Sequence, residues 1–123
     1  MGDDTVYRAT ALGASYARIG RLPVTILLDN VRSLYNVGAF FRTADAVRAQ
    51  SIILAGITPT PEDRRIAKTA LGAERTVPWS KSADPGVAID GLRSSGFEIA
   101  AVETSLRAVD LFDWRPRFPV CII

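Results

Sequence analysis

Short apolar runs recur along the chain. The segments between them space their apolar residues differently. Residues 24–28 (VTILL) form a nearly continuous β-prone run directly after Pro23, which is typical of a strand buried on both faces. The other predicted strands are 51–55, 97–102 and 119–123, with a short strand or edge segment at 76–79. Together these runs predict the strands of a sheet with an apolar interior.

Helical periodicity appears between these strands. Residues 37–48 place apolar side chains three and four positions apart, with Asn36 as the predicted N-cap. A second helix is predicted over 62–71 with Thr60 as its cap, and a third over 85–94. Strands that alternate with helices of about ten residues predict an α/β domain with a largely parallel sheet and flanking helices.

The length allows one domain. The chain has 123 residues, of which 48% are apolar and 23% charged, as expected for a globular protein with a single core. Residues 1–21 show no clear period and are predicted to be an N-terminal arm or short helix before a domain at 22–123. We expect a cytoplasmic protein without a membrane segment, because there is no long apolar run and no signal-peptide pattern at the start.

Missing residue types exclude several kinds of chemistry. The chain has no histidine, which excludes Ser-His-Asp and Cys-His catalysis and imidazole-ligated metals. We expect no metal site. The single cysteine, Cys121, lies in an apolar run and is predicted to be a small core residue. There is also no glycine-rich dinucleotide or Walker motif.

The basic residues are mostly arginines. The net charge is +2, and Lys68 and Lys81 are the only lysines among fifteen basic residues. Arginine binds phosphate bidentately and stacks on bases, so the composition is compatible with a nucleic-acid partner. Codon usage in a GC-rich genome explains the same bias equally well.

The loop after the first strand is the most polar candidate site. Ligands bind at the carboxyl ends of strands in open parallel sheets, and this loop of residues 29–36 leads to Asn36 at a helix start. Arg42 follows six residues later, about 240° around the helix axis. Asn36 and Arg42 could therefore face one site only if the chain bends where it enters the helix. Alternatively, Asn36 only caps the helix and Arg42 is a solvated charge. Small and apolar neighbours predict partial burial of Arg42, with Asp45 as its local partner.

These residues carry a family resemblance. Residues 28–44 (LDNVRSLYNVGAFFRTA) closely resemble the first motif of the SpoU/TrmH-type RNA ribose methyltransferases of the SPOUT superfamily. Residues 68–74 (KTALGAE) and 77–79 (VPW) look like the family's second helix and the strand after it. The resemblance covers residues 22–123.

The resemblance implies transfer of a methyl group from S-adenosylmethionine to a ribose 2′-hydroxyl of tRNA or rRNA, without a metal. By motif match, Asn36 and Arg42 take the catalytic positions, and Asn30 and Arg32 are candidate RNA contacts. The guanidinium group of arginine keeps its proton in proteins, so it cannot accept one as a base. We therefore expect Arg42 to bind the phosphate beside the target ribose, with Asn36 fixing Arg42 or the helix start.

The resemblance also implies that motifs are missing. The family's second motif (Gly-Asn-Glu) and third motif, which form the C-terminal trefoil knot and most of the cofactor pocket, are not in this sequence. We therefore expect a SPOUT-type domain incomplete at its C-terminus, with no cofactor-binding residues of its own and no activity by itself. The complete protein is expected to be a homodimer. The alternatives are a knotless, non-catalytic relative that binds RNA or protein, and an unrelated α/β domain for a small ligand.

Three further pairs of residues allow two interpretations each. Arg64 and Lys68, four residues apart, are candidate RNA contacts or part of a solvated helix. Trp79 and Trp114 could stack on bases, although both are more typical of packing. Asp110 and Asp113 resemble a carboxylate pair but are interpreted as loop residues.

Overall fold

A computed structural model describes residues 19–123, so most of the predicted N-terminal arm (1–18) lies outside the described residues. The helices and strands follow in the order β1 (Leu22–Asp29), α2 (Leu34–Val47), β2 (Ala49–Ala55), η1 (Arg64–Ile66), α3 (Ala67–Ala70), η2 (Ala73–Arg75), β3 (Trp79–Ser82), α4 (Pro85–Ser94), β4 (Glu98–Ala100) and β5 (Val120–Ile122).

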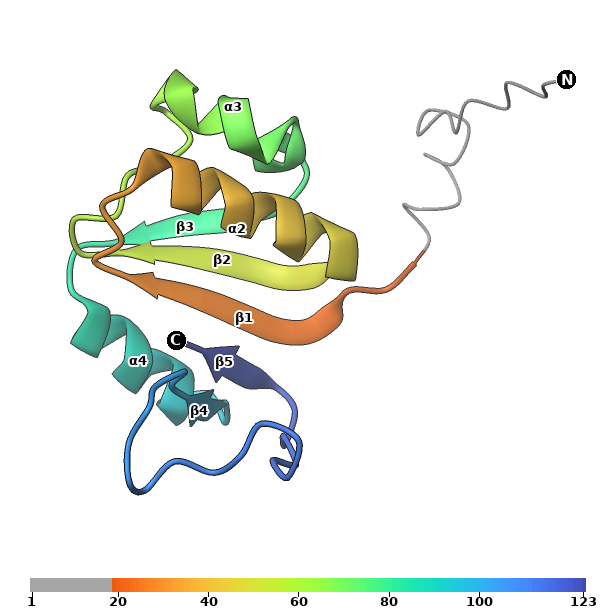
Figure 1. The fold of residues 1–123 in the computed structure, drawn as a ribbon, viewed down its shortest axis with the longest axis vertical. Helices are drawn as coiled ribbons and strands as arrows, with labels where there is room; N and C mark the ends of the chain where they lie inside the picture. The colour runs from red at the N-terminus through yellow and green to blue at the C-terminus, as the bar shows by residue number, and fades with distance from the viewer. Residues whose placement is uncertain (1–18) are drawn as a thin grey trace, which may run out of the picture.

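The five strands form a parallel sheet in the order β3-β2-β1-β5-β4. Helices α2 and α3 cover one face and α4 covers the other (Figure 1). β1 is central: Ile26 pairs with Ile52 of β2 on one side and with Ile122 of β5 on the other. The predicted α/β class with a largely parallel sheet is confirmed. None of the described helices is long and apolar enough to cross a membrane.

Alternate residues of β1 enter two separate cores, which is why the run reads as continuously apolar. Leu28 packs beneath α2 with Phe41 and Leu54. Leu27 packs on the opposite face with Cys121 and the apolar side of α4. Cys121 is fully buried, as predicted, and burial raises the pKa of its thiol to about 11.

The start of α2 differs from the prediction. The N-cap is Ser33, whose Oγ accepts a hydrogen bond from the backbone N of Asn36 at 3.1 Å. Asn36 therefore lies inside the first turn, and its prediction as the cap was wrong. Both residue types are good caps; the earlier start lets Leu34 pack against the core.

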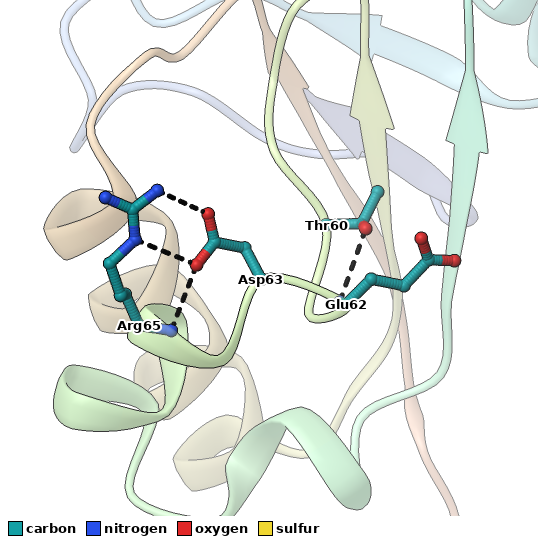
Figure 2. Close-up of polar contacts among 4 residues, drawn as sticks. All are labelled: Thr60, Glu62, Asp63 and Arg65. Carbon is teal, nitrogen blue, oxygen red and sulfur yellow. Dashed lines mark hydrogen bonds and ion pairs between the residues drawn. The ribbon is translucent and has the colours of Figure 1, made fainter.

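The second helical region is shorter than the predicted 62–71. Asp63, not Thr60, caps it, and Asp63 Oδ1 accepts from the backbone N of Arg65 at 3.1 Å. The Arg65 guanidinium also pairs with Asp63 at 2.8 Å, whereas Thr60 only accepts a long bond of 3.4 Å from Glu62 N (Figure 2). The Asp63 carboxylate therefore caps the start of η1. Helix α3 ends at Leu71, whose backbone adopts a left-handed conformation.

The remaining boundaries follow the sequence closely. Helix α4 spans the predicted 85–94, capped by Asp84. The edge strand β3 lies at 79–82, slightly later than the predicted 76–79. Trp79 packs partly buried against the α2 core, and Asp110 accepts from the backbone N of Phe112 within an exposed loop. The packing interpretation of Trp79 and the loop interpretation of Asp110 are confirmed.

Glu98 on β4 anchors the long connection of residues 101–119. Its Oε1 accepts from Trp114 Nε1 at 3.0 Å, and its Oε2 accepts from Arg117 N at 2.6 Å. These hydrogen bonds, that of Trp114 first, lower the pKa of the Glu98 carboxyl. Trp114 is thereby a packing residue of this connection.

We expect the attachment of this connection to weaken in acid. The pKa of Glu98 is lower in the folded than in the unfolded chain. Its contribution to the stability of the folded chain is therefore complete above the ordinary carboxyl pKa. The contribution is lost as the pH falls through the lowered value. Tryptophan fluorescence, titrated in wild type and Glu98→Gln, should show an acid transition only in wild type. An identical transition in both proteins would assign it to another group.

Candidate functional site

The carboxyl ends of β1, β2 and β3 are joined by a polar network. Asn30 has a left-handed backbone with φ of 54°. Its Oδ1 accepts from Ile57 N at 2.9 Å, and its Nδ2 donates to Asp29 Oδ1 at 2.8 Å. The carboxamide therefore links the loop after β1 to the loop after β2. Gly56 permits this link, since a Cβ there would lie 2.0 Å from Asn30 Oδ1.

Two residues that sequence analysis did not identify complete the network. The buried Thr58 hydroxyl accepts from Val31 N at 3.0 Å and lies 2.7 Å from the Ala55 carbonyl oxygen. Lys81 Nζ donates to the carbonyl oxygens of Gly56 and Thr58. The sequence gives only weak signals for these two residues: Thr58 lies in a Thr-Pro-Thr-Pro loop, and Lys81 is one of only two lysines.

We expect that removing the Asn30 carboxamide alone will show how much this link contributes to stability. Asn30→Gly keeps the positive φ at no steric cost and deletes the acceptor for Ile57 N–H. The free energy of unfolding should fall by about 1 kcal/mol, and the Ile57 amide should exchange with solvent faster. Urea denaturation and amide exchange test this, with Asn30→Asp, which retains an acceptor oxygen, as the control. Unchanged exchange at Ile57 in Asn30→Gly would show that the link does not form.

Asn36 and Arg42 lie on one continuous helix. Helix α2 runs unbroken from Leu34, so their side chains leave its axis about 120° apart. The bent entry that would turn both toward one site is not present. Both residues are exposed.

The environment of Arg42 differs from the prediction. Arg42 is exposed, so the expected partial burial was wrong. Within residues 19–123 no ion pair joins it to Asp45; Asp45 Oδ1 instead accepts from Thr76 Oγ1 at 2.8 Å. The reason is that α3 and η2 pack against the buried stripe of α2 and leave the Arg42 position at its flank.

The other candidate RNA contacts are exposed cations around the start of α2. Arg32 lies in the loop before α2, Arg64 in η1 and Lys68 in α3. Thr69, next to Lys68, donates from Oγ1 to the Tyr35 carbonyl oxygen at 2.8 Å, which joins α3 to the first turn of α2. The structure therefore brings segments 32–36 and 64–69 together.

A cavity of about 640 Å³ lies between β4 and the connection of residues 101–119. Its walls include the apolar side chains of Ile99, Val102 and Val109, and its polar groups include Glu103 and Arg107. Sequence analysis did not anticipate this cavity, because it forms between a strand and a loop whose contacts are not periodic. Among the described residues no cluster of His, Cys, Asp and Glu could hold a metal ion.

Comparison with known proteins covers most of the chain. The model of the SpoU rRNA Methylase family matches residues 23–123. An uncharacterised tRNA/rRNA methyltransferase of Synechocystis sp. is 35% identical over an alignment of 98 positions that covers 72% of this chain and 24% of that protein. The tRNA (guanosine(18)-2′-O)-methyltransferase of Escherichia coli is 30% identical over an alignment of 114 positions that covers 88% of this chain and 49% of that enzyme. The chain thus spans from a quarter to a half of the length of these relatives.

Solved structures agree on the fold. An rRNA methyltransferase from Sinorhizobium meliloti superimposes with a TM-score of 0.74 and 27% identity, over 87% of this chain and 42% of that one. The SpoU methyltransferase AviRb from Streptomyces viridochromogenes, crystallised with AdoMet, superimposes with a TM-score of 0.71 over 85% of this chain and 43% of that one; at 22% identity this likeness shows the fold alone. The family match over residues 23–123 and the shared fold establish that this chain belongs to the SpoU rRNA methylase family.

Proposed function

We propose that the protein carrying this domain methylates a ribose 2′-hydroxyl of tRNA or rRNA and uses S-adenosylmethionine as the methyl donor. The observation that carries the proposal is the match of residues 28–44 to the family's first motif, folded as the β1 end, the following loop and α2. The names of the relatives, tRNA and rRNA methyltransferases, support the substrate class.

Arg42 binds the phosphate beside the target ribose in this proposal. Its guanidinium is exposed and makes no hydrogen bond or ion pair with the described residues, so its planar donors are available to a phosphate. Holding that phosphate would orient the 2′-hydroxyl toward the methyl donor. Arg42 acts only by binding and orienting, because a guanidinium does not give up its proton in proteins.

Asn36 acts separately from Arg42. The angle of about 120° between the two positions means that Asn36 does not hold the guanidinium. Asn36 instead presents its carboxamide at the first turn of α2, where backbone N–H groups also favour an anion. The two residues would then contact different parts of the RNA strand.

The cavity beside β4 fits part of the cofactor. Its volume is within the range of small-molecule sites, and its lining combines apolar walls for a purine ring with the Glu103 carboxylate for ribose hydroxyls. S-adenosylmethionine supplies an electrophilic methyl group when bound. Ile99, Val102 and Glu103 would contact its adenosine portion. This assignment departs from the expectation that the chain holds no cofactor-binding residue of its own.

The remaining expectations extend the proposal. RNA is the proposed partner, homodimerisation the proposed assembly and the cytoplasm the proposed location. A non-catalytic RNA- or protein-binding role is the alternative, and one assay separates the two.

The test is methyl transfer by the protein at its natural length. Purified protein is incubated with methyl-labelled S-adenosylmethionine and total tRNA or rRNA, and the modified nucleoside is identified after digestion. A 2′-O-methylated nucleoside is the expected product. Salt-dependent RNA binding without label transfer would support the non-catalytic alternative, and a methylated base would contradict the proposed 2′-oxygen target.

A further inference from the structure

Tyr35 is an exposed aromatic side chain in the first turn of α2. It is 71% exposed, whereas Leu34 beside it is half-buried and Val37 is fully buried. The ring therefore contributes little to the core, although two neighbours in the same turn do. A large ring left in water at the edge of a candidate site is available to a ligand.

The backbone beneath Tyr35 is firmly held. Ser33 caps the helix one residue before its start, and Thr69 Oγ1 donates to the Tyr35 carbonyl oxygen at 2.8 Å. Gly38 lets α3 approach closely, since a Cβ there would lie 2.6 Å from the Ile66 carbonyl oxygen. The position of the Tyr35 backbone relative to α3 is thus set by direct contacts.

Tyr35 and Arg42 share one stripe of α2. Seven residues separate them, which brings their directions within about 20° and places them about 10 Å apart along the axis. Between them on this flank lie only Gly38 and Ala39. Gly38 lies against α3, so the aromatic ring and the phosphate-binding group are spaced along the side of α2 that borders α3.

Three cationic residues lie in the segments that adjoin Tyr35. Arg32 precedes it in the loop, and Arg64 and Lys68 come from the segment that Thr69 joins to it. Arg32, Arg64 and Lys68 have no carboxylate partner among residues 19–123, in contrast to Arg65, which pairs with Asp63. This charge favours a polyanion.

We propose that Tyr35 stacks on a base of single-stranded RNA while Arg32, Lys68 and Arg42 contact the phosphates of the same strand. The inference rests on the proposed function and assigns to its site a base-stacking residue. Aromatic rings beside a basic surface bind single strands in this way, because every base has a π-face. Loss of one such stack costs roughly 5- to 150-fold in affinity.

The test measures binding of a short oligoadenylate to the 123-residue chain by fluorescence anisotropy over a range of salt concentrations. Tyr35→Ala should weaken binding roughly 5- to 150-fold without changing the slope of log K against log salt. Lys68→Gln should reduce that slope by about one. Tyr35→Phe keeps the ring and should recover most of the affinity.

Two controls separate stacking from other effects. Phe40→Ala removes another exposed aromatic from α2, 42% exposed and about 140° away from Tyr35, and should leave the affinity unchanged. When binding is measured with an abasic oligonucleotide of the same length, the loss of affinity caused by Tyr35→Ala should disappear. Equal penalties for Tyr35→Ala and Phe40→Ala, or a penalty that persists without bases, would overturn the inference.

The outcomes also distinguish this inference from the proposed function. If Tyr35→Ala binds like wild type and Lys68→Gln binds more weakly, the stacking role is wrong while RNA remains the partner. If the wild-type chain does not bind the oligonucleotide even at low salt, the inference is overturned. The proposed function is then judged independently by the methyl-transfer assay.

Discussion

Replacing Arg42 by alanine is expected to lower the rate of methyl transfer to RNA by about 10²- to 10³-fold, the usual cost of removing one positioned charge-stabilising group. The physical reason is that the exposed guanidinium is the group proposed to hold the phosphate beside the reacting ribose. Arg42→Lys keeps the charge but not the planar donor pair, so its rate should lie between those of wild type and Arg42→Ala. Initial rates with labelled cofactor measure the effect.

The fold should not change in these variants. Arg42 makes no ion pair with the described residues and is exposed, so the free energy of unfolding should stay within about 0.5 kcal/mol. Arg93→Ala is the matched control, because Arg93 is an exposed arginine of α4 that forms only a 3.5 Å pair with Asp90. Wild-type rates in Arg42→Ala would refute the assigned role. An equal loss in Arg93→Ala would indicate a general effect of charge.

Gly38→Ala is expected to destabilise the domain by about 1–3 kcal/mol through overpacking. A Cβ at this position would lie 1.9 Å from Thr69 Oγ1, 2.6 Å from the Ile66 carbonyl oxygen and 2.9 Å from Ala70 N. The Thr69 side chain could rotate away, but the two backbone atoms cannot move without separating α3 from α2. Rotation of Thr69 would in addition break its hydrogen bond to the Tyr35 carbonyl oxygen.

Gly91→Ala is the control for this prediction. Gly91 lies inside α4, and a Cβ there would meet nothing within 4 Å. Alanine should therefore stabilise the domain by about 0.5–1 kcal/mol through its higher helix propensity. Urea unfolding of both variants measures the contrast. If Gly38→Ala were as stable as Gly91→Ala, the close approach of α2 and α3 would be contradicted.

The close approach of these helices also bears on the site. Gly38 stands between Tyr35 and Arg42 in the sequence and against α3 in space. Gly38→Ala should therefore shift Lys68 relative to α2 and weaken RNA binding as well as stability. A variant that lost stability but kept full affinity would separate the packing of α3 from its proposed role at the RNA surface.

The class of fold and the family could be predicted from the amino-acid sequence. The run at 24–28 is apolar on both faces, and a strand of this kind is stable only between two layers. It therefore predicted a strand buried on both faces, and β1 lies at the centre of the sheet. Asp84 and Pro85 marked the start of α4 correctly because capping depends on atoms within one helical turn. The motif at 28–44 indicated the family for a related reason: it is contiguous.

The details of the site depend on contacts that exist only in the folded chain. Ser33 and Asn36 are both suitable caps, and packing of Leu34 on the core selected Ser33. Asn30 remains a candidate RNA contact, and only the folded chain reveals that its carboxamide also accepts from the backbone N of Ile57, which is 27 residues away. The exposure of Arg42 depends on where α3 packs, and the position of β5 between β1 and β4 depends on the whole sheet. Local signals extend over about one helical turn, whereas the contacts that shape this site join residues distant along the chain, and their partners are known only once the chain has folded.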